Sequence, residues 1–306
     1  MARRPLSLLG AALAVGLTLS ACGGGGDDDA FSSGGGDDDT VTLGSANFPE
    51  SELLMEIYAG ALEAQGIRTR TQPNIGSREI YLKALEDGSI DLIPEYNGAL
   101  LAALQTEVPE DLTSTEAVDA ALQKVLPEGT ETLTPSAAED KDSLTVTAAT
   151  AQEYDLSTIS DLVPVAPELV VGAGPEFGER FQGIEGLKSV YGIEFKQFRP
   201  LDVGGPLTVS ALKDGSIDVG NIFTTDSSIT TEDFTVLEDD KNLYSSQNVL
   251  PLIRSSKASD EVTETLDAVS AALTTENLTA ALARVQVDKD APATVAEQFL
   301  ADQDLD

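Results

Sequence analysis

After residue 40, stretches in which hydrophobic residues recur at every second position alternate with stretches in which they recur at every third or fourth position. The first pattern predicts strands and the second predicts amphipathic helices. In the first part of this region the order is strand, helix, strand, helix, strand. The predicted elements are a strand at Val41–Ser45, a helix from Asn47 to about Gln65, a strand at Ile67–Gln72, a helix at Arg78–Asp87 with Ser77 as its cap, and a strand at Ile90–Tyr96. Since crossovers between parallel strands are right-handed, this order predicts a parallel, doubly wound sheet.

A similar order of elements returns in the second half of the chain. The predicted elements are a helix at Ser114–Val125, strands at Ser143–Ala149 and Leu169–Gly172, helices from Gly174 and over Gly183–Tyr191, a strand at Glu194–Arg199, a helix at Gly205–Asp214, a strand that ends at Phe223, a strand at Val249–Arg254, and helices to the end. The chain would therefore cross between two lobes near 143–149 and again near 248–254. Two crossings predict a two-segment hinge, with the C-terminal helices packed on the first lobe.

One stretch of this pattern occurs twice. ALEDGSIDLIPEY, Ala84–Tyr96, is repeated as ALKDGSIDVGNIF, Ala211–Phe223, with seven of thirteen positions identical. Each copy predicts a helix end, a glycine turn and a short strand closed by an aromatic residue. Because ligands bind at the carboxyl ends of strands in open α/β sheets, Tyr96 and Phe223 are predicted to face each other across a cleft. The alternative is that both rings only fill the edge of a sheet.

Polar residues lie at the same predicted edge as Tyr96. Ser45 and Asn47 precede the first helix, and Ser77 precedes the second. Free N–H groups at a helix start suit an anionic group such as a carboxylate. Plain helix capping is the alternative for each of these side chains.

The charge and the rare residue types exclude several functions. With 53 acidic and 18 basic residues the net charge is −35, which argues against a nucleic-acid partner. The chain has no histidine and one cysteine, Cys22, so histidine-dependent nucleophiles, histidine-ligated zinc and an intramolecular disulfide are excluded. The aspartate runs lack the spacing of a calcium loop, and the glycines near Gly174 lack that of a dinucleotide loop. We expect no cofactor and no metal.

The first 21 residues have the pattern of an export signal: Arg3 and Arg4, an apolar run over Leu6–Leu19, and small residues. The sequence Leu19-Ser20-Ala21-Cys22 resembles a lipobox, which predicts lipidation of Cys22 and attachment to the outer face of the bacterial cell membrane. A plain signal peptide and a twin-arginine signal are the alternatives. Residues 22–40, rich in Gly, Ser and Asp, predict a flexible tether.

A series of short motifs, in order along about residues 41–306, resembles one known family. The motifs are GSANFPESELLMEIYAGALEAQG, NIGSRE, PEYNG, ISDL, GPEFGER, VYGIEFK, FTTD and LEDDK. They are similar to the extracellular binding components of ABC importers for glycine betaine, choline and related osmoprotectants. The resemblance implies a two-lobed α/β periplasmic-binding-protein fold with a mixed, doubly wound sheet in each lobe. It also implies a monomer that delivers its solute to a permease and an ATPase. Lobe I would comprise 41–143 and 249–306, and lobe II 144–248.

The resemblance also implies ligand-binding residues. In this family a quaternary ammonium lies in a cage of aromatic faces. Tyr96 and Phe223 match cage positions, and Arg180 matches a carboxylate-binding position. The chain departs from the family pattern at four positions, where Asp142 and Val209 stand for cage tyrosines, Gln247 for a further aromatic and Ala46 for a lysine. The remaining predicted site residues are Ser45, Asn47 and Thr224.

Three further hypotheses remain open from the sequence. Two aromatic residues where relatives have four, together with Asp142 and Gln247, favour a less methylated ligand with N–H donors. An exported enzyme using the carboxylates of Asp142 and Glu95 is a second hypothesis. A surface sensor that delivers its ligand to no permease is the third.

Overall fold

The computed structural model describes residues 39–105, 112 and 114–306. Residues Asp39–Asp306 form one compact unit with two five-stranded sheets. None of the helices in these described ranges is long and apolar enough to cross a membrane. The predicted signal segment, Cys22 and nearly all of the predicted tether lie outside them.

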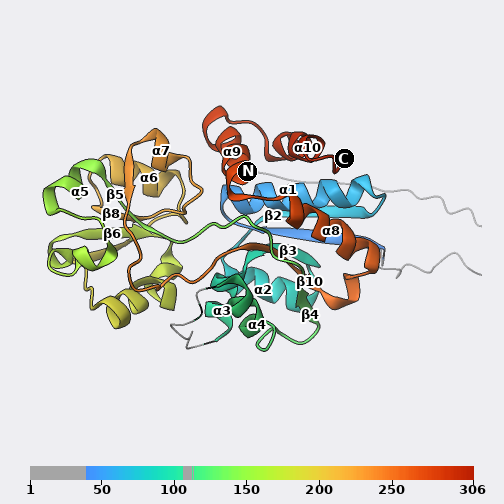
Figure 1. Cartoon of the computed structure of the whole chain (residues 1–306), viewed down its shortest axis with the longest axis horizontal. Coiled ribbons are helices and arrows are strands. Elements are labelled where there is room, and N and C mark those ends of the chain that lie inside the picture. The colour runs from blue at the N-terminus through green and yellow to red at the C-terminus, as the bar shows by residue number, and fades with distance from the viewer. Residues whose placement is uncertain (1–38, 106–111, 113) are drawn as a thin grey trace, which may run out of the picture. The chain divides into compact units, whose positions relative to one another are not determined.

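The first sheet combines the start of the described chain with one late strand. Its order is β2 (Arg68–Gly76), β1 (Thr40–Ala46), β3 (Leu92–Tyr96), β10 (Val249–Arg254) and β4 (Thr130–Thr132). β1 pairs in parallel with β2 and β3, whereas β10 runs antiparallel to β3 and β4. In Figure 1 the orange β10 accordingly lies among blue and green elements. The doubly wound core predicted from the first five elements is confirmed.

The second sheet is built from the middle of the chain in the same way. Its order is β7 (Gln197–Pro200), β6 (Val170–Ala173), β8 (Val219–Asn221), β5 (Leu144–Thr147) and β9 (Phe234–Val236). β6 pairs in parallel with β7 and β8, whereas β5 runs antiparallel to β8 and β9. In each lobe four strands therefore run in one direction and one, β10 or β5, runs against them, which gives the mixed sheet that the resemblance implied.

Helices from both ends of the described chain cover the first sheet. They are α1 (Pro49–Ala64), α2 (Arg78–Asp87), α3 (Asn97–Leu104), α4 (Thr115–Leu122), α8 (Asp260–Ala272), α9 (Thr275–Ala283) and α10 (Pro292–Asp302), with helical turns at Ser255–Lys257 and Arg284–Asp288. Leu53, Ile57 and Tyr58 of α1 share one hydrophobic cluster with Leu266 of α8 and Phe299 of α10. Burial of this apolar surface holds the C-terminal helices on the first lobe, in agreement with the prediction.

The helices of the second lobe are shorter. They are α5 (Ala148–Tyr154), α6 (Pro206–Lys213) and α7 (Ser228–Thr231), with helical turns at Ile159–Leu162, Ala166–Glu168, Pro175–Gly178, Phe181–Glu185 and Leu187–Tyr191. The single helix predicted over Gly183–Tyr191 is wrong, because Gly183 has a non-helical backbone and the segment divides into two wide turns. An added Cβ at Gly183 would also lie only 1.9 Å from the Phe177 carbonyl oxygen, so the close approach requires glycine.

The repeated stretch has the same local structure in both lobes. Gly88 and Gly215 adopt left-handed conformations, with φ of 79° and 72°, at the ends of α2 and α6. Asp91 Oδ2 then accepts a hydrogen bond from Thr42 N in β1 at 2.9 Å, and Asp218 Oδ2 accepts one from Val170 N in β6 at 2.7 Å. Each repeat aspartate therefore fixes the central strand of its sheet, β3 or β8, beside the neighbouring parallel strand, β1 or β6.

The two repeats differ at the carboxyl ends of their strands. Tyr96 is the last residue of β3, but β8 ends at Asn221, two residues before Phe223. The prediction that each aromatic closes its strand is therefore wrong for Phe223. The strand predicted over Ser143–Ala149 also ends early, at Thr147, where Thr147 caps α5 through its side chain. The short strands β4 and β9 and the helix α3 were not predicted.

Two segments, 133–143 and 237–248, connect the sheets. They pair with each other where they cross, since Glu139 and Asn248 form an antiparallel bridge and Asp140 N donates to Gln247 O at 3.1 Å. The crossing segments carry Asp140, Asp142 and Gln247 to the carboxyl ends of both sheets. The predicted lobe boundaries, 41–143 with 249–306 and 144–248, fall at the ends of these segments.

Candidate functional site

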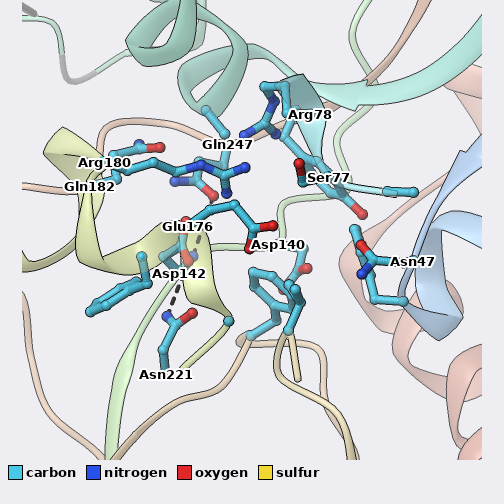
Figure 2. Close-up of a pocket in the computed structure, with 18 of the residues that line it drawn as sticks. Asn47, Ser77, Arg78, Asp140, Asp142, Glu176, Arg180, Gln182, Asn221 and Gln247 are labelled. Carbon is cyan, nitrogen blue, oxygen red and sulfur yellow. Dashed lines mark hydrogen bonds between the residues drawn. The ribbon is translucent and has the colours of Figure 1, made fainter. Parts of the chain in front are cut away.

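A cavity lies between the two sheets. The centre of a water molecule can occupy about 60 Å³ of it. One water needs about 10–15 Å³ of such space, so the cavity suits a compact solute of a few heavy atoms. Its lining is Ala46, Asn47, Phe48, Ser77, Arg78, Tyr81, Tyr96, Ala99, Asp140, Asp142, Gly174, Glu176, Phe177, Arg180, Gln182, Val203, Asn221, Phe223 and Gln247. Figure 2 shows the polar members of this set pointing toward one another. Both lobes and both crossing segments therefore contribute to one site.

Three aromatic rings form a contiguous group on the cavity wall. Phe48, the residue before α1, has its ring centroid 6.2 Å from that of Tyr96 and 5.2 Å from that of Phe223. Tyr81 and Phe177 also line the cavity. Phe48 was not predicted from the sequence, because it precedes a helix and does not end a strand. The aromatic surface is consequently larger than the two predicted rings.

Tyr96 is joined to the second lobe through Glu50. The Tyr96 hydroxyl donates to Glu50 Oε1 at 2.6 Å, and Thr225 Oγ1 donates to Glu50 Oε2 at 2.5 Å. Glu50 is only 2% exposed although it lies in the first turn of α1. A lining residue of the first lobe is thereby linked to the loop that follows Phe223.

Glu50 lies beside a second buried carboxyl group. Asp140, 2% exposed, accepts hydrogen bonds from Thr225 N at 3.0 Å and Thr224 Oγ1 at 3.3 Å. Burial and the neighbouring Glu50 raise the pKa of Asp140 well above its ordinary value. Burial likewise raises the pKa of Glu50, against the opposing effect of its hydrogen bonds. The two carboxyl groups therefore favour holding a proton in the folded protein.

Asp142 is the carboxylate that points into the cavity from the first crossing segment. Asn221 Nδ2 donates to Asp142 Oδ1 at 3.0 Å, and the backbone N of Asp142 donates to Gln247 Oε1 at 3.3 Å. Burial raises the pKa of Asp142, while the Asn221 amide and the charges of Arg180 and Arg78 act in the opposite direction. Asp142 therefore lies among donors from three separate segments (Figure 2).

Two arginines line the cavity, and each already has a carboxylate partner outside the lining. Arg78 Nε and Nη2 donate to the Glu95 carboxylate at 2.8 and 3.0 Å, and Arg180 Nε and Nη2 donate to that of Glu79 at 3.0 Å each. Because Arg180 belongs to the second lobe and Glu79 to α2, this pair joins the lobes. Partial burial opposes ionisation of Glu79, but the hydrogen bonds from Arg180 and Ser77 lower its pKa to about 2. Three carboxyl groups of the lining have no arginine partner of this kind: Asp140, which favours holding a proton, and Asp142 and Glu176.

Six of the nine predicted ligand-binding residues line the cavity: Asn47, Tyr96, Asp142, Arg180, Phe223 and Gln247. The structure places the other three elsewhere. Ser45 is fully buried, where its Oγ donates to Ala46 O and accepts from Asn74 N. Val209 packs on the apolar cluster beneath α6, and Thr224 is exposed with its Oγ1 accepting from Lys141 N at 2.8 Å.

Helix capping does not account for Ser77, although the sequence suggested that it would. Ser77 stands at the start of α2, but its side chain makes no capping hydrogen bond there and lines the cavity instead. Its neighbour Arg78 was also missed by the sequence analysis. The only local signal was its place directly after the predicted cap, at the edge shared with Tyr96.

Glu95 does not line the cavity, so it is not placed to act with Asp142 in acid–base chemistry. Its carboxylate is fully buried and accepts from Arg78, from the Tyr81 hydroxyl at 2.7 Å and from Tyr96 N at 3.0 Å. All of its hydrogen-bonding capacity is therefore used in holding α2 against β3. Among the described residues, no group of three or more histidine, cysteine or acidic side chains is arranged to hold a metal ion.

A two-lobed α/β protein with a small-solute cavity at the junction of its lobes belongs to the periplasmic-binding-protein class. Residues 39–302 match the family model for the substrate-binding domain of the ABC-type glycine betaine transport system. The chain belongs to this family, whose members are the substrate-binding components of ABC importers.

Individual relatives agree with the family assignment. The chain is 26% identical over 279 residues to the glycine-betaine-binding protein of Pseudomonas aeruginosa, covering 87% of this chain and 88% of that protein. It is 27% identical over 273 residues to the carnitine transport binding protein OpuCC of Listeria monocytogenes, covering 85% and 86%.

Solved structures share the fold. A glycine betaine/carnitine/choline ABC transporter structure has a TM-score of 0.68 at 24% identity, covering 87% of this chain and 99% of that one. The lactococcal OpuAC in its closed-liganded conformation with glycine betaine has a TM-score of 0.61 at 17% identity, covering 87% and 96%.

Proposed function

We propose that the protein captures a small zwitterionic or cationic solute, such as glycine betaine, choline or a related osmoprotectant, between its two lobes. It delivers this solute to an ABC permease with its ATPase. The observation that carries the proposal is the cavity itself, in which the aromatic group Phe48, Tyr96 and Phe223 shares one small space with uncompensated carboxyl groups. Membership of the family supplies the importer class.

The chemistry of the lining favours a cation. An ammonium group over an aromatic face gains about 0.5 to 2 kcal/mol for each ring, more when water is excluded. Both cavity arginines are paired with other carboxylates, Glu95 and Glu79, so neither forms an ion pair with Asp142 or Glu176. Tyr96, Phe223, Asp142, Arg180, Asn47 and Gln247 remain the proposed contacts, and Phe48 joins them. Ser45, Val209 and Thr224 lie outside the cavity lining and are no longer proposed as contacts.

A ligand with fewer methyl groups is the second candidate, and Asp142 favours it. Within the described residues, the Asp142 carboxylate accepts a side-chain hydrogen bond at Oδ1, from the Asn221 amide, and none at its other oxygen. A secondary or primary ammonium could donate to the other oxygen, which a quaternary ammonium cannot do. We infer no enzymatic activity, since the chain has no histidine and Glu95 is committed to Arg78.

Calorimetric titration tests the ligand. We expect heat and a single site with glycine betaine, choline, carnitine or proline betaine, with binding lost in Tyr96→Ala. Dimethylglycine and sarcosine, which carry fewer methyl groups, decide between the two candidates. No heat with any of these solutes at millimolar concentration would refute the osmoprotectant ligand.

We propose further that residues 1–21 are removed on export and that a lipidated Cys22 holds the protein, as a monomer, on the outer face of the cell membrane. The lipobox Leu19-Ser20-Ala21-Cys22 supports this proposal, and residues 22–40 provide the tether. Mass spectrometry of the mature N-terminus should find acyl chains on Cys22. Cys22→Ala should release the protein from the membrane fraction, and an unacylated mature protein would refute the anchor.

A further inference from the structure

Thr225, in the second-lobe loop that follows Phe223, connects two carboxyl groups that come from other elements. Its Oγ1 donates to Glu50 Oε2 of α1 at 2.5 Å, and its N donates to Asp140 Oδ1 of the first crossing segment at 3.0 Å. The other Glu50 oxygen accepts from the Tyr96 hydroxyl of β3 at 2.6 Å. Thr225 is 1% exposed and both carboxyl groups are 2% exposed, so the junction of the lobes holds two acidic side chains away from water.

The next residues of the same loop are attached to the C-terminal part of the first lobe. Gln286, in the helical turn Arg284–Asp288 between α9 and α10, donates from Nε2 to Asp226 Oδ2 at 2.6 Å. Its Oε1 accepts from Ser227 N at 3.0 Å and from Ser227 Oγ at 2.6 Å. Separating the lobes would break these hydrogen bonds together with the one between Thr225 and Glu50.

Entry of a solute requires such a separation. Tyr81, Tyr96 and Gln247 line the cavity and are 3%, 6% and 2% exposed, so a solute reaches them when the lobes move apart.

Opening would also move the two carboxyl groups apart. Asp140 lies in a segment that pairs with the loop of the second lobe, since Thr224 N donates to Lys141 O at 3.0 Å and Lys141 N donates to Thr224 Oγ1 at 2.8 Å. Glu50 belongs to α1 of the first lobe. We therefore expect Asp140 to stay with the loop while Glu50 leaves it, and both groups gain access to water.

Closure has the opposite effect on the proton affinity of the pair. Burial and the neighbouring Glu50 raise the pKa of Asp140. Burial raises the pKa of Glu50, and the charge of Asp226 acts in the same direction, against the hydrogen bonds that Glu50 accepts. Lys141, which follows Asp140 in the chain, is paired with Glu139 at 3.2 Å. The closed junction thus favours a protonated pair, whereas carboxyl groups in water are ionised at neutral pH.

We propose that Glu50 and Asp140 form a proton-dependent latch between the lobes: closure over a solute takes up a proton from the medium, and loss of that proton favours opening. The inference rests on the proposed function, because closure is the step that captures the solute, and it adds regulation of capture by the pH of the medium. The pair has a higher pKa in the closed state than in the open state, so the closed state is favoured at low pH. This advantage is lost as the pH rises through the closed-state pKa, and solute affinity should fall by up to about tenfold per pH unit for one proton.

Calorimetry with glycine betaine in buffers of different ionisation enthalpy, such as phosphate and Tris, measures the protons that accompany binding. Between about pH 5.5 and 8, wild type should take up more protons than the double variant Glu50→Gln with Asp140→Asn, by a difference that approaches about one per solute. Glutamine suits position 50 because both partners of Glu50 are hydroxyl groups, which accept as well as donate. Asp142, whose pKa burial raises, can exchange a proton with the solute too, but it is present in both proteins, so the difference excludes its contribution.

Two further variants complete this test. Glu264→Gln, on the exposed face of α8, is the control and should keep the proton uptake of wild type. Asp140→Asn alone should lose most of the difference, and it replaces the double variant if circular dichroism shows the double variant to be unfolded. Proton uptake that is the same in wild type and in the folded variants would overturn the latch.

If no osmoprotectant gives heat, the distance between the lobes in the absence of solute still decides the inference. Nitroxide labels at Glu86→Cys of α2 and Ser210→Cys of α6, both exposed positions, report this distance by pulsed electron paramagnetic resonance in a Cys22→Ala background. The distance distribution should shift to shorter values as the pH is lowered from about 8 to 5.5, and the double variant should not show this shift. Such a result would support the latch and refute only the proposed ligand. Distributions that do not change with pH, or that change equally in both proteins, would overturn the latch.

Discussion

The Tyr96 hydroxyl donates to Glu50 at 2.6 Å, and this hydrogen bond connects the ligand cavity to the junction of the lobes. Glu50 accepts from Thr225 on its other oxygen, so one side chain bridges a cavity residue of the first lobe and a loop of the second. The aromatic ring and its hydroxyl consequently have separate tasks. The ring lines the cavity, whereas the hydroxyl satisfies a buried carboxyl group.

Tyr96→Phe isolates the hydroxyl. It should lower the free energy of unfolding by about 1–3 kcal/mol, because Glu50 loses a donor in a buried position. Ligand affinity should fall less than in Tyr96→Ala, since the ring remains. Urea denaturation and calorimetry measure the two effects. Tyr154→Phe on α5 is the control. Equal destabilisation by both variants would show that the Tyr96 hydroxyl does not stabilise the fold through Glu50.

The three contiguous rings should each contribute to ligand binding. Phe48→Ala, Tyr96→Ala and Phe223→Ala should each weaken binding at least about tenfold without unfolding the protein, because each removes an aromatic face from the cation. Calorimetric titration measures the affinities, and circular dichroism checks the fold. Normal affinity in all three variants would mean that the rings only fill the edge of the sheets.

The Glu50 and Asp140 pair should make the protein less stable as the pH rises. Both groups have raised pKa values in the folded state, so the folded protein binds more protons than the unfolded chain above the ordinary values of 4.5 and 3.8. The stabilisation is present at low pH and is lost as the pH rises through the raised folded values.

Asp140→Asn tests this pair, because its Oδ1 can still accept from Thr225 N while its amide stays neutral at every pH. The free energy of unfolding of wild type minus that of Asp140→Asn should decrease with pH when measured by urea denaturation between about pH 4 and 9. A difference that does not vary with pH would contradict the raised pKa of Asp140.

Glu79 should have the opposite effect on the pH dependence of stability: its contribution should be lost at acid pH. Its pKa falls from 4.5 to about 2 in the folded state, so its contribution is present above the unfolded value and is lost as the pH drops toward 2. Glu79→Gln should remove this part of the acid dependence. At neutral pH the cost should stay within about 1 kcal/mol, because the pair is partly exposed and screened by solvent. If Glu79→Gln loses stability at acid pH in the same way as wild type, the Glu79–Arg180 interaction is not the source of this acid dependence.

The repeat aspartates should be structural in both lobes. Asp218→Ala removes the acceptor for Val170 N and should cost about 1–3 kcal/mol in the free energy of unfolding. Asp91→Ala should cost more, since Asp91 also accepts from Arg254 at 3.0 Å. Denaturant titration of both variants, with the exposed Asp304→Ala as control, measures the costs. A neutral Asp218→Ala would show that the two repeats do not share this function.

The sequence by itself determined the two-lobed architecture and the family. Helix and strand periods depend on neighbours a few residues apart, so β1, α1, α2, β3 and β10 were predicted close to their observed ends. The repeat carries its turn glycine and its strand-fixing aspartate within thirteen residues, which is why both copies were recognisable.

Tertiary structure alone decided which side chains meet. Phe48 joins Tyr96 and Phe223, and Arg78 faces Gln247, through contacts between segments far apart in the chain. Ser45, Val209 and Thr224 have suitable positions in sequence but lie buried under the edge or out on the surface. Local periodicity fixes the direction of a side chain relative to its own element only. The cavity depends on how two sheets and two crossing segments pack together, and that packing is set by burial and pairing across the whole chain.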